Sequence, residues 1–210
     1  MVERQLRRRG IDDERVLAAM AAVPREEFVA DDLRAHAYDD SALPIGHGQT
    51  VSQPWVVAAI CQALELQGDE RVLEIGTGSG YSAAVLAQLG REVISVERIG
   101  ELAARAAATL ARLGVDNVRV VKADGSAGLE DPEPFQAIAV HAATPAVPPA
   151  LAAQLVPGGR LVAPIAERGA DVLTVFRRTD DGTGEPELGR RRIAPCRFVP
   201  LVGEGGFSEA

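Results

Sequence analysis

The stretch "LEIGTGSGY", residues 73–81, places three glycines between an apolar run and a helix-forming run. Gly76, Gly78 and Gly80 allow the backbone to turn sharply, and they let a ligand approach the main chain closely. A helix that begins directly after such a turn presents free N–H groups and the positive end of its dipole. The stretch therefore predicts a ligand site at a strand-to-helix turn. The alternative is a glycine turn that only packs the strand against the helix.

The spacing of these glycines indicates which ligand is bound. A dinucleotide-binding turn has the pattern G-x-G-x-x-G, which from Gly76 would place Tyr81 where the third glycine belongs. The observed order is an acid, Glu74, followed by glycines at every second position. It resembles the S-adenosylmethionine site of Rossmann-like methyltransferases, whose ligand carries an amino-acid end and no pyrophosphate. The resemblance implies that Glu74 binds the cofactor's ammonium group, and that the turn lines the cofactor with Gly76, Thr77, Gly78, Ser79 and Gly80.

Two further acids follow predicted strands. Glu97 ends a strand 21 residues after Gly76, where its carboxylate can accept hydrogen bonds from both ribose hydroxyls. Asp124 follows the next strand and is predicted to accept a hydrogen bond from the adenine amino group, with Gly125 keeping the rim open. An Asp-Gly pair is also typical of an ordinary turn. Because open α/β sheets bind ligands at the carboxyl ends of strands, these acids are predicted to share one site.

The elements that position these residues alternate regularly along the chain. Apolar runs predict strands, and helical periodicity predicts helices between them. The alternation predicts an α/β fold with a doubly wound, mostly parallel sheet and right-handed crossovers. A turn at 180–189 and a returning strand within 191–201 predict an antiparallel edge. The strands are expected at 71–75, 92–97, 117–123, 135–142, 159–165 and 171–179, and the helices at 81–89, 101–113 and 148–155.

The N-terminal quarter of the chain has a different pattern. Helices are predicted at 1–9 and 12–22, the second with Asp12 as its N-cap. Residues 31–53 read as an irregular connection that is long enough to suggest a working loop, and Pro54 fits the first turn of the next helix. We expect a single methyltransferase domain over 1–210, with N-terminal helices and an active-site loop in 1–53 and a Rossmann-like core in 54–210.

The composition of the chain argues against several classes of function. Hydrophobic residues make up 47% of the chain, the net charge is −8 and the pI is about 5.0, and an acidic protein is not expected to bind nucleic acid generally. Cys61 and Cys196 lack C-x-x-C spacing, so no metal site is expected. The N-terminus lacks the apolar segment of a signal peptide, and no stretch reaches the roughly 18 apolar residues of a membrane span. A cytoplasmic protein without a membrane partner is therefore expected.

Five stretches together resemble the protein-L-isoaspartate O-methyltransferase family over nearly the whole chain. They are "VPREEFV" (23–29), "AYDDSALPIGHGQTVSQP" (37–54), "RVLEIGTGSGYSAAVLAQL" (71–89), "VERI" (96–99) and "RFVPL" (197–201). The resemblance implies methyl transfer from S-adenosylmethionine to the α-carboxylate of isoaspartyl residues in damaged proteins, which begins their repair through a succinimide and leaves S-adenosylhomocysteine. It implies an active-site serine at Ser52 and a substrate-binding loop of Gln49, Thr50, Val51 and Ser52. We expect a monomer, with 197–201 returning near the site.

The chemistry of this reaction fits such a loop. A carboxyl group with a pKa near 4 is already ionised at neutral pH, so the reaction needs no general base. The site is then expected to hold few titrating groups and many orienting hydrogen bonds, which Thr50 and Ser52 can supply. The loop's main chain can pair with an extended peptide, and Gly46 and Gly48 would let the loop close. Alternatively, Ser52 only caps the helix that starts at Pro54.

The sequence is compatible with other functions. His141 stands where the family usually has a small residue, often threonine, and it either hydrogen-bonds at the rim or alters substrate choice. With the same chemistry, the enzyme could methylate a dedicated aspartate in a peptide or partner protein. That branch often carries an extra recognition segment, which is not expected here because the sequence ends at Ala210. A small-molecule methyltransferase and a non-enzymatic nucleotide-binding module are the remaining alternatives.

Overall fold

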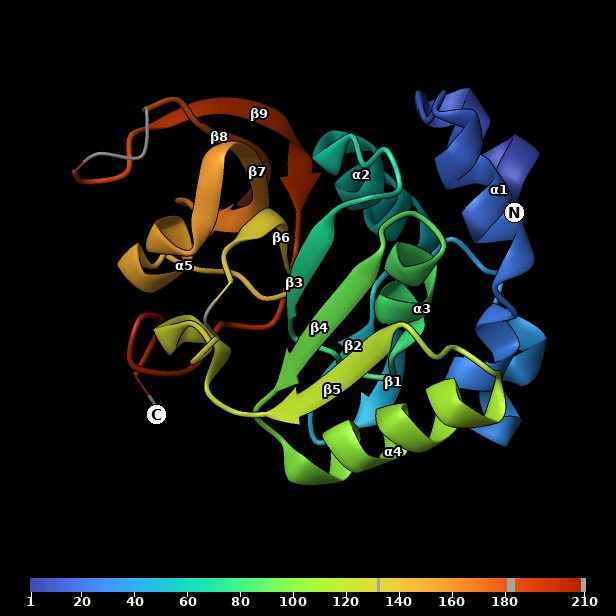
Figure 1. The fold of residues 1–210 in the computed structure, drawn as a ribbon. Coiled ribbons are helices and arrows are strands. Elements are labelled where there is room, and N and C mark those ends of the chain that lie inside the picture. Colours follow the sequence, from blue (N-terminus) through green and yellow to red (C-terminus); the bar gives the residue numbers. More distant parts are fainter. Residues whose placement is uncertain (132, 181–183, 209–210) are drawn as a thin grey trace.

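A computed structural model describes residues 1–131, 133–180 and 184–208 (Figure 1). Its centre is a seven-stranded sheet with the strand order β5-β4-β3-β6-β7-β8-β9. The first four strands in this order are parallel to one another: β5 (Val118–Lys122), β4 (Glu92–Glu97), β3 (Arg71–Ile75) and β6 (Phe135–Val140). All five residues of β3 are buried, as expected for the middle of a sheet covered on both faces.

The other half of the sheet turns antiparallel, as the sequence predicts. Strand β7 (Leu155–Ala166) runs parallel to β6, and β8 (Asp171–Arg178) and β9 (Leu188–Cys196) then pair antiparallel in succession. Part of the predicted turn at 180–189 lies outside the described residues. After β9, residues 197–201 leave the regular strand and return beside the parallel half, where Pro200 bridges Ala143.

Helices cover the two faces of the sheet unequally. Alternate residues such as Val72 and Val93 pack on one face against α1 (Glu14–Ala22), α2 (Pro54–Leu64), α3 (Tyr81–Ala87) and α4 (Gly100–Arg112). Their neighbours Leu73 and Ile94 pack on the other face with α5 (Pro149–Ala153) and the C-terminal residue Leu201. The period-two alternation of a strand explains this division, and it directs Glu74 to the four-helix side.

The N-terminal segment differs from the predicted pair of helices. Residues 2–9 form a short π-helix, η1 (Val2–Leu6), and a 3-10 turn, η2 (Arg7–Arg9), and the N-cap of α1 is Asp13 and not Asp12. The Asp13 carboxylate accepts hydrogen bonds from the backbone N–H groups of Arg15 and Val16, which satisfies two of the free donors of the first turn. The 3-10 turns η3 (Arg25–Phe28) and η4 (Asp31–His36) follow.

The segment predicted as an irregular loop contains a β-hairpin. Strands β1 (Leu43–Gly46) and β2 (Gln49–Val51) pair antiparallel, and His47 and Gly48 form the turn with positive φ angles of 53° and 69°. Strands this short show no clear alternation of apolar and polar residues, so the sequence pattern does not predict them. Helix α2 begins at Pro54 as predicted, but its N-cap is Gln53 and no side chain caps it, so the capping role considered for Ser52 is absent.

Candidate functional site

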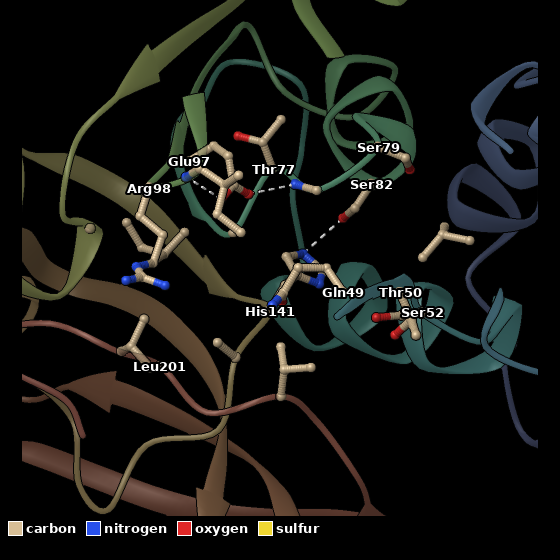
Figure 2. Close-up of a pocket in the computed structure, with 18 of the residues that line it drawn as sticks. Gln49, Thr50, Ser52, Thr77, Ser79, Ser82, Glu97, Arg98, His141 and Leu201 are labelled. Atoms are coloured by element: carbon tan, nitrogen blue, oxygen red, sulfur yellow. Dashed lines mark hydrogen bonds between the residues drawn. The ribbon is translucent and has the colours of Figure 1, made fainter. Parts of the chain in front are cut away.

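A cavity lies at the carboxyl ends of β3, β4 and β6, where the sequence predicts a ligand (Figure 2). Four segments supply its walls: the hairpin and its continuation at residues 49–52, the glycine turn at 76–79, the end of β4 at 96–99, and the C-terminal stretch 199–202. Single residues from other elements complete it, including Ser82, Gly125 and His141. The cavity thus brings the predicted substrate loop and most of the predicted cofactor residues to one place.

The glycine turn has the sharp backbone conformation that its sequence predicts. Gly76, Gly78 and Gly80 have φ angles of 92°, 55° and 90°, a region that side chains disfavour. Gly76 and Gly78 line the cavity together with Thr77 and Ser79. Gly80 packs toward helix α4, where an added Cβ would lie 3.3 Å from the Cβ of Ala106. Gly80 therefore permits close helix packing and does not line the cavity.

Glu97 holds the turn in position from the end of β4. One carboxylate oxygen, Oε2, accepts a hydrogen bond from the Gly78 N–H at 2.9 Å, and Oε1 accepts one from the Ile99 N–H at 2.9 Å (Figure 2). Glu97 is only 6% exposed, yet it lines the cavity. A carboxylate has about four lone-pair sites, so it can accept further hydrogen bonds from ribose hydroxyls.

The two residues of the Asp-Gly pair have separate positions. Gly125 lines the cavity, and an added Cβ there would lie 2.6 Å from Cγ2 of Ile75, so only glycine leaves this surface open. Asp124 is not among the residues that line the cavity, and its expected contact with adenine stays a prediction. Its carboxylate accepts hydrogen bonds from Ser126 N–H at 2.9 Å and from Glu204 N–H at 2.8 Å. Asp124 therefore fastens the C-terminal segment beside the site.

Glu74 lies deeper than the residues of the glycine turn. It is completely buried and is not among the residues that line the cavity, and its expected contact with the cofactor's ammonium group stays a prediction. Ser95 Oγ donates a hydrogen bond to Glu74 Oε2 at 2.5 Å, and Thr77 Oγ1 lies 2.5 Å from Ser95 Oγ. His141 Nε2 lies 3.3 Å from Glu74 Oε1, without the alignment of a hydrogen bond, so Oε1 is a buried acceptor with no hydrogen-bond donor.

The hairpin brings the predicted substrate residues to the cavity. Gln49, Thr50, Val51 and Ser52 all line it. The Ser52 backbone is held from behind by Arg25, a fully buried residue whose Nη2 donates to the Ser52 carbonyl at 2.7 Å. Arg25 Nε donates to the Ala37 carbonyl at 2.7 Å, and its guanidinium lies 4.6 Å from the centre of the Tyr81 ring. Arg25 therefore fixes the loop that carries Ser52.

Sequence reasoning did not select several residues of the cavity. Ser82, in the first turn of α3, hydrogen-bonds His141 Nε2 at 2.8 Å (Figure 2). Arg98 and Ile99 follow Glu97 on the cavity wall. Both belong to the "VERI" stretch, which could have indicated them as site residues. The expected return of "RFVPL" is confirmed, because Val199, Pro200 and Leu201 line the cavity. No sequence pattern pointed to Ser82, because its hydrogen-bond partner His141 is 59 residues away in sequence.

Within residues 1–131, 133–180 and 184–208, no group of three or more His, Cys, Asp or Glu side chains is arranged to hold a metal ion. No helix in the same ranges is long and apolar enough to cross a bilayer.

Comparison with known proteins agrees with this geometry. The model of the protein-L-isoaspartate(D-aspartate) O-methyltransferase family matches residues 1–206. The chain belongs to this family. A protein-L-isoaspartate O-methyltransferase from Rhodopseudomonas palustris is 53% identical over 211 residues, which cover 99% of this chain and 84% of the relative. One from Koribacter versatilis is 48% identical and covers 100% of this chain and 92% of the relative.

Solved structures of isoaspartate methyltransferases have the same fold. One protein-L-isoaspartate O-methyltransferase superposes with a TM-score of 0.86 at 30% identity, covering 98% of this chain and 67% of the other. A Plasmodium falciparum structure described as an isoaspartate methyltransferase in complex with S-adenosyl-L-homocysteine has a TM-score of 0.79 at 26% identity, covering 93% and 94%. The predicted Rossmann-like class I methyltransferase fold is therefore confirmed, with S-adenosylmethionine as the family's cofactor.

Proposed function

We propose that this chain transfers a methyl group from S-adenosylmethionine to the α-carboxylate of L-isoaspartyl residues in damaged proteins, which begins their repair through a succinimide. One observation carries the proposal. The hairpin residues Gln49–Ser52 and the cofactor elements, the glycine turn and Glu97, line the same cavity. A cavity walled by both sets suits direct transfer between two bound molecules. We further propose that the chain works as one methyltransferase domain spanning residues 1–210.

The described residues fit the cofactor. Glu97 offers acceptor positions for the ribose, and Gly125 leaves open a surface that a Cβ would fill. Apolar side chains of Ile75, Val96 and Ile99 line the same wall and suit an adenine ring. Bound S-adenosylmethionine supplies a methyl group on a sulfonium centre and leaves as a neutral thioether. Gly76, Thr77, Gly78 and Ser79 are proposed to border its amino-acid end.

The residues of the hairpin are proposed to orient the acceptor. The substrate carboxylate is ionised at neutral pH and the leaving group is neutral, so the protein supplies position and no proton transfer. Thr50 and Ser52 are two residues apart, so their side chains project to the same side of an extended chain. Their hydroxyls can donate hydrogen bonds to a carboxylate held in the cavity. Ser52 is therefore the proposed catalytic residue.

The acceptor is proposed to be recognised largely through its main chain. Strand β2 pairs only with β1 in the described sheet, so one edge of this two-stranded unit has N–H and C=O groups for an extended peptide. Such pairing does not depend on the client's side chains. The net charge of −8 disfavours a nucleic-acid partner, and we propose a cytoplasmic monomer that acts on isoaspartyl peptides and proteins.

The decisive experiment compares two peptides that differ in one linkage. The full chain is incubated with labelled S-adenosylmethionine and either an isoaspartyl peptide or its normal aspartyl twin. Base-labile methyl ester should form on the isoaspartyl peptide only. Equal methylation of both peptides, or of neither, would contradict the repair reading and favour a dedicated aspartyl acceptor.

A further inference from the structure

Strand β9 forms one edge of the seven-stranded sheet and carries a run of three arginines, Arg190, Arg191 and Arg192. Among the strands of the described chain, β9 pairs with β8 alone, and Figure 1 shows it along the outer margin of the sheet. Its free side therefore has main-chain N–H and C=O groups without a partner strand. Residues 189–192 are all exposed. An extended peptide can add to such an edge as a further strand.

Arginines of two neighbouring strands continue the positive charge across the sheet. Arg177 of β8 lies directly opposite Arg160 of β7, and Arg191 lies opposite Val175, two residues before Arg177. Residues two apart in a strand share a face, so all three arginines project on the side where Val175 is buried. Like charges directly opposite each other destabilise a sheet. Within the described chain, Arg160 alone of the three has a carboxylate partner, Glu65 at 2.5 Å.

The second face of β9 is positively charged as well. Arg190 and Arg192 project away from the face of Arg191, because successive side chains of a strand alternate. Arg192 Nη1 lies 3.1 Å from Glu167 Oε1, whereas no side chain in the ranges that the structure describes pairs with Arg177, Arg190 or Arg191. We call these three residues and the free side of β9 the arginine edge. It offers cations on both faces to one added strand.

The charge of the arginine edge indicates its partner. Residues 155–198 hold eight arginines and six acidic residues, although the whole chain has a net charge of −8. A second copy of this chain does not fit, because two antiparallel copies of β9 would place arginine opposite arginine. The acidic remainder of the molecule disfavours a nucleic acid. The fitting partner is an extended protein segment rich in Asp and Glu, whose main chain pairs with β9 and whose carboxylates accept hydrogen bonds from the guanidinium groups.

One client protein can reach the arginine edge and the cavity together. Val199, on the cavity wall, follows Arg192 by seven residues. Seven residues span at most about 25 Å even when fully extended. An acidic segment that is joined to the isoaspartyl residue by about ten residues therefore covers the distance. Segments of high charge and low hydrophobicity stay unfolded, so they are free to extend along β9.

We propose that the arginine edge is a second binding site for clients, which holds an acidic, extended segment of a protein while its isoaspartyl residue occupies the cavity. The inference rests on the proposed function, since it takes isoaspartyl proteins as the substrates. The bound segment adds a strand beside β9 and raises the effective concentration of the isoaspartyl residue at the cavity. It lowers KM for acidic clients and leaves kcat unchanged, because the arginine edge is not part of the cavity wall.

Steady-state kinetics with peptides of equal length test the proposal. Each peptide carries one isoaspartyl residue, a flexible linker of about ten residues and a tail of about six Glu, Gln or Lys residues, and the tail is placed on either side of the isoaspartyl residue. For the full chain, KM should be roughly tenfold lower with the Glu tail than with the Gln tail on at least one side. The difference should shrink above about 0.3 M NaCl, because salt screens exposed charges. Equal KM values on both sides would overturn the proposal, and the arginines would then only keep sheet edges of different molecules apart.

Substitution of the three arginines locates the effect. The combined variant Arg177→Gln, Arg190→Gln and Arg191→Gln should lose the advantage of the Glu tail and keep its kcat and its KM for the Gln-tailed peptide. Replacing the same residues by Glu should reverse the preference in favour of the Lys tail, a gain that no folding defect produces. An advantage of the Glu tail that persists in the Gln variant would refute the assignment to β9.

The matched control removes three exposed arginines from other parts of the surface. Arg4→Gln, Arg8→Gln and Arg91→Gln change the net charge by the same amount, and the combined variant should keep the advantage of the Glu tail. A loss as large as in the β9 variant would mean that the overall charge attracts acidic clients, and it would also refute the assignment.

A direct binding measurement separates this inference from the proposed function. A fluorescent hexaglutamate peptide without an isoaspartyl residue should bind the wild-type chain in an anisotropy titration, and its N-methylated form should not, because it cannot donate main-chain hydrogen bonds to β9. Tighter binding of a single-stranded oligonucleotide of the same charge would overturn the choice of a protein segment. If no isoaspartyl peptide is methylated, the proposed function is wrong. If all three tailed peptides are methylated with equal KM, only the role of the arginine edge is wrong.

Discussion

At the scale of single residues, Ser52 and Glu97 face one cavity but are suited to different partners. Ser52 belongs to the hairpin segment and offers a hydroxyl, which can donate to a carboxylate. Glu97 offers only acceptors, two of whose contacts already fix the backbone at Gly78 and Ile99. Substitutions at the two positions should therefore have separate effects. A change at Ser52 should lower turnover, and a change at Glu97 should lower cofactor affinity.

Ser52→Ala should lower kcat by roughly 10- to 100-fold, because one hydrogen bond to a charged acceptor contributes about 1.5–3 kcal/mol. Affinity for S-adenosylhomocysteine should change little, since the hydroxyl is assigned to the acceptor. Steady-state kinetics with an isoaspartyl peptide and calorimetry with the cofactor product measure the two quantities. An equal loss in both, or a loss in neither, would remove the orienting role.

Glu97→Ala should weaken binding of S-adenosylhomocysteine by about 1–3 kcal/mol. The affinity falls because the ribose hydrogen bonds are lost and because the backbone at Gly78 and Ile99 is no longer held by the Glu97 carboxylate. Glu97→Gln keeps one carbonyl acceptor and should lose less. Unchanged calorimetric affinity in the alanine variant would contradict the ribose assignment.

At the scale of elements, the N-terminal segment supports the active-site hairpin. The stretch "VPREEFV" places Arg25 beneath Ser52 and Ala37, and Arg25 stacks on Tyr81 at the start of α3. The buried guanidinium thus joins three segments that are far apart in sequence. Its structural role explains why a basic residue lies in an otherwise apolar interior.

Arg25→Lys tests this connection. A lysine ammonium cannot reproduce both directed hydrogen bonds from one planar group, so the free energy of unfolding should fall by about 1–3 kcal/mol. The value of kcat/KM for the peptide should fall more than cofactor affinity, because the Ser52 loop loses its support. Urea unfolding and peptide kinetics measure both effects. Arg8→Lys, at an exposed position, is the control and should change neither.

The sequence predicted some elements to the residue and missed others. Strands at 71–75 and 92–97 were predicted with the observed bounds, because short apolar runs between turn residues are typical of central parallel strands. The hairpin at 43–51 was missed, since its strands of four and three residues are too short to show an alternation of apolar and polar residues. Spacing also located the acids but not their partners. Glu74 meets His141 and Asp124 meets Glu204 through contacts distant in sequence.

At the scale of the whole molecule, the carboxyl ends and the amino ends of the central strands have different roles. The carboxyl ends of the strands carry the cavity, whereas the amino end of β3 carries an ion-pair cluster around Arg71. The Arg71 guanidinium donates to Asp131 at 2.8 and 2.9 Å and to Glu92 at 2.7 Å, and it lies over the Phe135 ring. This cluster ties β3, β4 and the segment before β6 together.

Asp131→Asn should lower the Tm at pH 7 by a few degrees, since about 1 kcal/mol corresponds to roughly 2–4 °C at this size. Hydrogen bonding to Arg71 lowers the pKa of Asp131. The stabilisation is therefore complete above the unfolded pKa of about 3.9, and it is lost as the pH falls through the folded value. Thermal unfolding should show the gap between variant and wild type narrowing toward pH 3. A gap independent of pH would contradict the ion pair, and Asp116→Asn, at an exposed site, should show none.

The placement of the C-terminal segment has a practical consequence. Gly203 lies so close to Asp124 that an added Cβ would be 2.1 Å from a carboxylate oxygen, and Leu201 and Val202 just before it form part of the cavity wall. The N-terminus and the described C-terminal segment 199–208 lie on opposite sides of the molecule (Figure 1). A purification tag that follows the C-terminal segment would come only a few residues after the cavity wall at 199–202, whereas one joined to Met1 would lie on the other side of the molecule. Ligand affinities should therefore be measured on a chain tagged at Met1.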